Sequence, residues 1–185
     1  MPTDAALDTA SSRRRVVEWS DPALVAKAGL DGLAFLRAMM TGEVPPPPLI
    51  AVLGIDLGSA EPGRVTMRMG PGAYLHNPLG SVHGGALASL LDSVMGCAVH
   101  ATLPLGRGDT TLEITVNDLR TVPAASGTLT AAGEVVHAGR RQAVAEARLT
   151  GGAGRPRATA STTCLLIDLS PPAPDPVVAA WTRVS

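Results

Sequence analysis

The sequence predicts an α+β domain in which about five or six antiparallel strands wrap around one long apolar helix. An apolar run starts at His83-Gly84-Gly85 and continues to Val99, and segments of alternating apolar residues lie on both sides of it. The length of the run and its lack of β-branched residues before Val94 favour helix over strand. The later alternating segments are joined by short links, which require antiparallel neighbours. A helix that is apolar on nearly every side must be enclosed by its domain.

Composition excludes several classes of protein. The chain has 185 residues, a net charge of -1, and only two Trp, one Tyr and one Phe, so neither a basic surface nor a base-stacking surface for nucleic acid is expected. No apolar run reaches the roughly 18 uncharged residues of a membrane span, and no signal peptide is visible. The spacing of Cys97 and Cys164 matches no metal site. We therefore expect a cytoplasmic protein with reduced thiols and no metal.

Proline and glycine divide the chain into four parts. We expect a disordered tail over residues 1–20, helices and a proline linker over 21–48, the main domain over 49–169, and a Pro-rich tail over 170–185. Within the second part, the patterns predict helices over 23–28 and 31–41, followed by an extended linker at 45–48.

Alternation of apolar residues predicts six strands in the main domain, and the first of them could begin as helix. The strands are expected at residues 49–57, 64–69, 111–119, 126–137, 140–150 and 157–167. The side chains expected to face inward are Val65, Met67 and Met69; Leu112, Ile114 and Val116; and Ala143, Ala145, Ala147 and Leu149.

One face of the long helix carries small or polar residues instead of apolar ones. Gly85, Ser89, Asp92 and Gly96 are separated by steps of four, three and four, which keeps them on one side of a helix. An unpaired buried carboxylate costs several kcal/mol, and no Lys or Arg lies between Arg68 and Arg107. Asp92 therefore either caps a loop, or pairs with an arginine from elsewhere in the fold, or takes part in the chemistry of the protein.

The start of the same helix favours the chemical interpretation. Gly84 and Gly85 allow close approach of a ligand, and free N–H groups in a first helical turn bind an oxyanion. Gly84 and Asp92 are about 12 Å apart along a helix, whereas a reacting carbonyl needs each group at roughly 3 Å. Both can act only if they come from two copies related by a twofold axis. The spacing therefore predicts a homodimer with shared sites.

The motif Asn-x-x-Gly-x-x-His-Gly-Gly, followed by Asp nine residues after the His, resembles the hotdog-fold acyl-CoA thioesterases of the phenylacetate-pathway (PaaI-like) type. Its members here are Asn77, Gly80, His83, Gly84, Gly85 and Asp92. A weaker likeness runs from about Pro45 to Asp168. The resemblance implies a hotdog fold, an acyl-CoA substrate, no cofactor beyond the coenzyme A of that substrate, and a homodimer or a dimer of dimers.

The resemblance also implies roles for single residues. The Gly84 N–H polarises the thioester carbonyl, and Asp92 of the other subunit is general base or nucleophile. Asn77 orients water or substrate, or is a turn residue before Pro78. His83 fixes the loop near the carbonyl, or caps the helix. Thr111 or Thr110 places a hydroxyl near the carboxylate.

Further residues are candidates for substrate binding. Coenzyme A carries phosphates, so arginines are expected along its path, although each could equally be an ordinary solvated side chain. The candidates are Gly85, Ser89, Thr110, Arg120, Arg140 and Arg141. The family often has aromatic-Leu-Arg-Pro-Ala where this chain has Asp118-Leu-Arg-Thr-Val-Pro-Ala124, so the CoA contacts and the wall of the acyl pocket differ here.

Two other functions share this fold: a non-catalytic acyl-CoA-binding protein and an enoyl-CoA hydratase. The hydratase motif usually has Asp before the Asn and His directly after Pro-Leu, whereas here His76 precedes Asn77 and Gly80 follows Leu79. Phenylacetyl, hydroxylated aromatic and medium-chain acyl groups all remain open. The helix predicted over 31–41 either packs over the sheet or covers an acyl chain, because Met-bearing helices adapt to varied apolar shapes.

Overall fold

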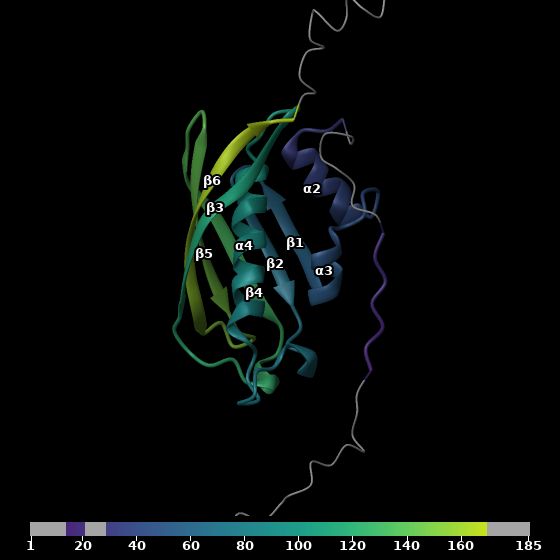
Figure 1. Ribbon diagram of the computed structural model, residues 1–185, viewed down its shortest axis with the longest axis vertical. Helices are drawn as coiled ribbons and strands as arrows, with labels where there is room; N and C mark the ends of the chain where they lie inside the picture. Colours follow the sequence, from purple (N-terminus) through teal and green to yellow (C-terminus); the bar gives the residue numbers. More distant parts are fainter. Residues whose placement is uncertain (1–13, 21–28, 170–185) are drawn as a thin grey trace, which may run out of the picture.

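In the computed structural model, which describes residues 14–20 and 29–169, α4 (Gly84–His100) lies against the inner face of a curved six-stranded sheet. Figure 1 shows the sheet curling around one side of α4, while α2 (Gly32–Thr41) and α3 (Pro48–Leu53) lie on the other side. The predicted α+β architecture, with one long central helix and additional N-terminal helices, is confirmed.

The six strands form one antiparallel sheet in the order β1-β2-β4-β5-β6-β3. Along the chain, α4 follows β2 and crosses the inner face of the sheet. β3 follows α4 and forms the edge of the sheet opposite to β1. Within the described residues, β3 therefore has a neighbouring strand on one side only. The strands are β1 (Ile55–Glu61), β2 (Arg64–Met69), β3 (Arg107–Asp118), β4 (Leu129–Ala138), β5 (Gln142–Thr150) and β6 (Pro156–Asp168).

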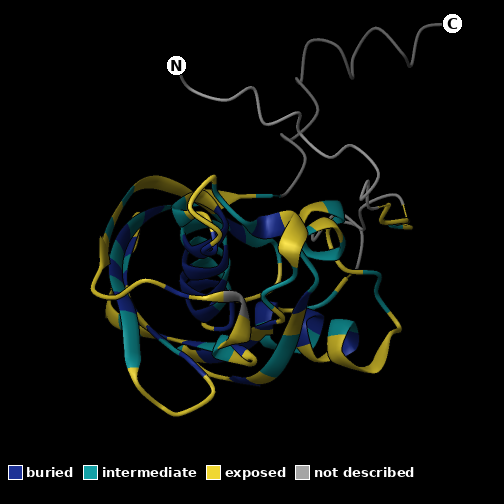
Figure 2. Ribbon diagram, turned by 90° about the horizontal axis from the view of Figure 1, so that it is seen from below, coloured by how far each residue is buried: buried dark blue, intermediate teal, exposed yellow. Residues whose placement is uncertain are grey.

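Burial explains why the apolar run is a helix. Its apolar side chains fill the core, and Figure 2 shows buried residues gathered on α4 and on the strands around it. The small or polar stripe remains on the side that the sheet does not cover: Gly85 is exposed, and Ser89, Asp92 and Gly96 are half-buried. The buried residues of α4 are Ala86, Leu87, Leu90, Leu91, Val94, Met95, Ala98, Val99 and His100.

Most of the predicted inward faces are confirmed. Val65, Met67 and Met69 on β2 are at most 1% exposed, and the alternating side chains of β5 from Ala143 to Leu149 are buried. Leu112 contradicts its prediction, because it is 52% exposed. The pairing of β3 with β6 skips a residue between Thr111 and Glu113, and this bulge removes Leu112 from the alternation.

The first half of the segment 49–57 is helix, the alternative that the sequence left open, and only its second half is strand. Pro47 and Pro48 start α3, and Gly54, with φ of 67°, ends it in the left-handed conformation that glycine favours. The alternating strand β1 begins only at Ile55. The strand predicted over residues 126–137 begins later as well, because a short 3-10 turn over Ala124–Ser126 precedes it.

Three expectations fall wholly or partly outside the described residues: the tail over residues 1–20, of which only 14–20 are described, the helix over 23–28 and the Pro-rich tail over 170–185. Residues 14–20 contain no helix or strand. The Arg15 guanidinium lies 3.8 Å from the centre of the Tyr74 ring, so this segment contacts the domain.

Helix and sheet approach most closely at Gly133 on β4. A Cβ atom at this position would lie 2.7 Å from the Val94 carbonyl oxygen of α4 and 3.2 Å from the Met95 nitrogen. Both atoms belong to the helix backbone and cannot move aside alone. Any side chain here would push α4 away from the sheet.

We expect Gly133→Ala to lower the free energy of unfolding by about 1–3 kcal/mol, the usual cost of overpacking a core. Gly70→Ala is the matched control, because a Cβ atom at Gly70 meets nothing within 4 Å. Urea unfolding followed by circular dichroism measures both variants. Equal stability of the two would contradict the close approach.

Candidate active site

Asp92 and Thr111 meet where the middle of α4 faces the edge strand β3. The Thr111 hydroxyl donates a hydrogen bond of 2.9 Å to Asp92 Oδ1. In the described part of the chain, no arginine, lysine or histidine forms an ion pair with Asp92. The interpretation of Asp92 as the partner of an arginine is therefore not supported there. A half-buried carboxylate held by a single hydroxyl keeps its second oxygen available for a proton.

Of the two threonines that sequence left open, Thr111 makes this bond. Thr111 pairs with the buried Cys164 of β6, so its side chain faces α4. Thr110 pairs with Leu165 and does not bond to Asp92, although it borders the same cavity.

The start of α4 is capped by His83. Its ring Nδ1 accepts a hydrogen bond of 2.8 Å from the Gly85 N–H, so the neutral ring carries its proton on Nε2. The Gly85 N–H is therefore occupied, and the expectation that both glycines offer free donors is wrong for this one. Among the described residues, the Gly84 N–H has no acceptor.

Asn77 folds its amide back into its own loop. Its Oδ1 accepts hydrogen bonds from the Leu79 and Ser81 N–H groups at 2.9 and 3.2 Å, and its Nδ2 donates to the Ser81 hydroxyl at 3.0 Å. This is the arrangement of an Asx turn, which shapes the loop that leads to His83. One N–H of the amide remains available for a further acceptor.

The two ends of the predicted site are separated within one chain. Gly84 and Asp92 are both on α4, about 12 Å apart along its axis. β3 runs beside them in the opposite direction: Thr111 reaches Asp92, and the Asp118 carboxylate lies 3.2 Å from where a Gly84 Cβ would be. Each end therefore has its own partner on the same edge strand.

A cavity of about 570 Å³ opens beside Asp92, between α4, β3 and the N-terminal helices. Its walls include Thr110 and Thr111 but neither Gly85 nor Ser89, which sequence named as binding residues. The Ser89 hydroxyl instead donates to the Gly85 carbonyl within the helix, at 2.9 Å. The volume lies in the range of small-molecule sites.

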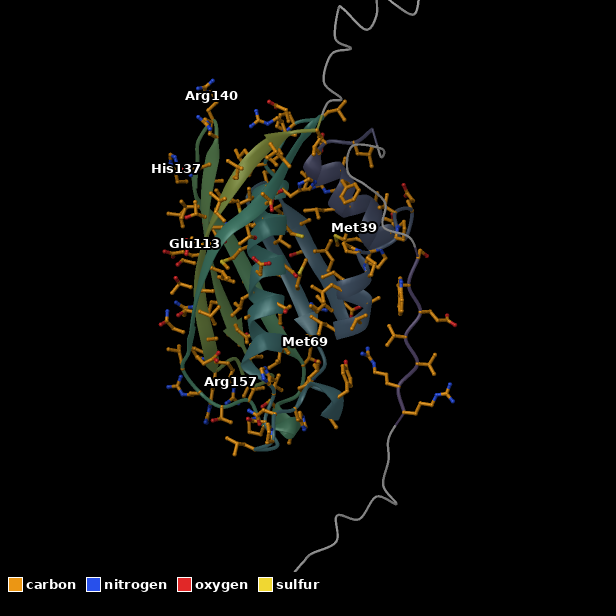
Figure 3. All side chains as sticks on the ribbon, in the orientation of Figure 1. Met39, Met69, Glu113, His137, Arg140 and Arg157 are labelled. Carbon is orange, nitrogen blue, oxygen red and sulfur yellow. The ribbon has the colours of Figure 1, made fainter. Side chains whose placement is uncertain are left out.

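The candidate arginines for coenzyme A do not form one cluster. Arg120 donates to the Pro156 carbonyl at the start of β6, whereas Arg141 accepts through its carbonyl from Leu166 near the end of that strand. Figure 3 shows the same separation, with Arg140 at one end of the long axis and Arg157, whose carbonyl accepts from the Arg120 N–H, at the other. Arg140 and Arg141 lie together on the turn between β4 and β5.

Sequence reasoning missed the hydrogen-bonded pair of His100 and Asp109. His100 Nδ1 lies 2.9 Å from Asp109 Oδ1, and the two side chains are 9% and 12% exposed. Both border the cavity at the end of α4 opposite to its N-terminus. Only the position of His100 in the last turn of a helix could have hinted at a structural role.

Cys97 borders the cavity but is a poor nucleophile. Loss of solvation among its neighbours, with smaller effects of the Asp109 and Asp92 charges, raises the pKa of its thiol to about 12. Within the described residues no group of His, Cys, Asp and Glu could hold a metal ion, and no helix is long and apolar enough to cross a membrane.

Comparison with known proteins identifies the family of this chain. A model of the thioesterase superfamily matches residues 79–157, the segment that contains α4 and β3. A relative from Pseudomonas aeruginosa named "Putative esterase PA1618" is 30% identical over 120 residues, which are 64% of this chain and 81% of that protein.

Two solved structures share the fold. The E. coli PaaI protein, from the phenylacetic acid degradation operon, is 27% identical and has a TM-score of 0.65 over 75% of this chain and 96% of its own. The protein smu.793 of Streptococcus mutans, solved bound to acetyl CoA, is 28% identical and has a TM-score of 0.57 over 62% and 89%. The chain therefore belongs to the thioesterase superfamily and is a hotdog-fold thioesterase of the PaaI-like type.

Proposed function

We propose that this thioesterase hydrolyses acyl-CoA thioesters to the free acid and coenzyme A, with Asp92 as the acid–base group or nucleophile. The observation that carries the proposal is a carboxylate that borders a cavity, is positioned by Thr111 and has no cation beside it among the described residues. The related Streptococcus mutans protein was solved with acetyl CoA, which supports a CoA thioester as substrate. Two free cysteines fit a reducing, cytoplasmic setting.

The proposed reaction uses the Gly84 N–H as donor to the thioester oxygen. Water, activated by Asp92, adds to the carbonyl carbon; alternatively Asp92 attacks directly and water then releases the acid. In either route the C–S bond breaks, and the departing sulfur takes a proton. His83, through its Nε2–H, and Asn77, through its free amide N–H, can donate further hydrogen bonds at the start of α4. Arg120, Arg140 or Arg141 can meet CoA phosphates.

The distance along α4 requires a second copy, so we propose a homodimer as the active unit. Thr111 lies beside Asp92 and Asp118 beside Gly84. A twofold axis that places Gly84 of one subunit beside Asp92 of the other therefore passes next to β3, midway between Thr111 and Asp118. Thr111 then lies opposite Asp118 of the partner subunit in an antiparallel ladder.

Two features of β3 support this pairing. It is the edge of the sheet and has no strand on its outer side among the described residues, so its backbone groups can accept another strand. Leu112, 52% exposed on the same strand, is an apolar side chain that pairing of the edges can cover. Two such dimers can also associate further, so a tetramer remains compatible with the proposal.

Asp92→Asn should lower kcat/KM by at least about 10², because an amide can neither accept the proton nor attack the carbonyl, and it should leave stability nearly unchanged. Release of free thiol from a panel of acyl-CoAs measures the loss. Glu146→Gln is the matched control, since Glu146 is exposed on β5 away from the cavity. Equal activity of Asp92→Asn and wild type would overturn the assignment.

Gly84→Pro should lower kcat by about 10²–10³, the usual effect of removing one oxyanion donor. Gly84 is the first residue of α4, where proline is tolerated, and the extended His83 before it suits a following proline. Gly84→Ala places the same Cβ atom near Asp118 but keeps the N–H, so it should retain most of the activity. Similar losses in both variants, measured by thiol release, would contradict the role of the backbone donor.

A further inference from the structure

The cavity beside Asp92 is built largely from the chain's own N-terminal helices. Its apolar walls include Met39 and Met40 of α2, Leu49 and Ile50 of α3, and Leu57 and Met67 of the first two strands. Figure 3 shows Met39 on the side of α4 opposite to Glu113 of β3. The side of the cavity that α2, α3 and these strands provide is therefore mostly apolar, with the Asp56 carboxylate of β1 as the exception.

The cavity is elongated along α4. Asp92, Gly96 and His100 are four residues apart, and all three border it. One end is the carboxylate with Thr111, and the other is the hydrogen-bonded pair of His100 with Asp109. The two ends are about 12 Å apart along the helix. Between them Gly96 contributes no side chain, so the wall is open midway.

Rigid packing between α2 and α4 supports the far end of the cavity, at His100. A Cβ atom at Gly32, the first residue of α2, would lie 1.8 Å from the His100 carbonyl oxygen, so the two backbones are in close contact. The Phe35 ring meets the His100 ring edge to face, with centroids 5.8 Å apart. The Asp31 side chain accepts a hydrogen bond from the Ala34 N–H and caps the same helix start. The contact between α2 and α4 therefore holds His100, the lining residue of α4 farthest from Asp92, in place.

We propose that this cavity is the acyl-binding site and that it selects linear saturated acyl chains of about eight to ten carbon atoms. This inference rests on the proposed hydrolysis of acyl-CoA at Asp92. An extended chain advances about 1.2 Å per bond, so the seven to nine bonds of such a chain span about 8–11 Å, and the terminal methyl group fills the rest of the roughly 12 Å between Asp92 and His100. Methionine, leucine and isoleucine side chains adapt to a flexible aliphatic chain.

An aromatic acyl group fits this shape less well. Among the described residues, Phe35 is the one Phe, Tyr or Trp side chain that borders the cavity, and its ring already packs against His100. A phenylacetyl group is shorter than the space between Asp92 and His100, and it would leave the inner part of the apolar wall uncovered. Preference for a long aliphatic chain follows, since each buried methylene contributes to binding.

The test is kcat/KM across a saturated series from acetyl-CoA to hexadecanoyl-CoA, with phenylacetyl-CoA included. Wild type should gain about fourfold per added methylene, reach its maximum at about eight to ten carbons, and prefer octanoyl-CoA to phenylacetyl-CoA. Gly96→Leu should place its side chain in the cavity about 6 Å beyond Asp92. The substitution should lower the ratio of kcat/KM for octanoyl-CoA to kcat/KM for butyryl-CoA by roughly two orders of magnitude, because about four methylenes lose their contacts.

Gly70→Leu is the matched control, because it adds the same side chain where a Cβ atom meets nothing within 4 Å and outside the cavity. Its chain-length profile should match wild type. A flat profile, a preference for phenylacetyl-CoA, or an unchanged ratio in Gly96→Leu overturns the acyl-site proposal while the hydrolysis itself stands. If the wild-type protein hydrolyses none of the acyl-CoAs in the series, both the acyl-site proposal and the proposed hydrolysis are overturned.

Discussion

The fixed rise of one enclosed helix is the constraint on which the rest of this structure depends. α4 is held along its apolar sides by the sheet, most closely at Gly133, so it cannot bend to bring its own ends together. Its N-terminal donor and its central carboxylate therefore stay about 12 Å apart in any single chain. The same helix can contribute both groups to catalysis only by supplying them to different sites.

Sequence reasoning predicted what local periodicity and spacing encode. The long helix, the antiparallel strands and the inward residues of β2 and β5 follow from alternation and helical steps, which depend on near neighbours. The contact of Thr111 with Asp92 was expected from the family resemblance, to within one residue. The stripe of small and polar residues also lies where its spacing placed it, on the side of α4 that the sheet leaves uncovered.

The remaining features depend on contacts between distant segments, which no local pattern records. The bulge that exposes Leu112 arises from the register between β3 and β6. The His83 ring accepts the hydrogen bond of the Gly85 N–H, which the spacing of the glycines alone left free. The Asn77 amide forms its hydrogen bonds within its own loop. The cavity is lined by residues of α2 and α3 together with the middle of α4, and its far end is bordered by His100 and Asp109. Tertiary packing decides each of these.

Mixing two inactive subunits tests most directly whether the site is shared. Subunits with Asp92→Asn keep the N–H of Gly84, and subunits with Gly84→Pro keep the carboxylate, so a mixed dimer contains one intact site and one doubly defective site. Co-expressed in equal amounts, the two variants should recover about a quarter of wild-type activity, because about half of the dimers are mixed and each has one working site. Activity no higher than that of the separate variants would contradict a site built from two subunits.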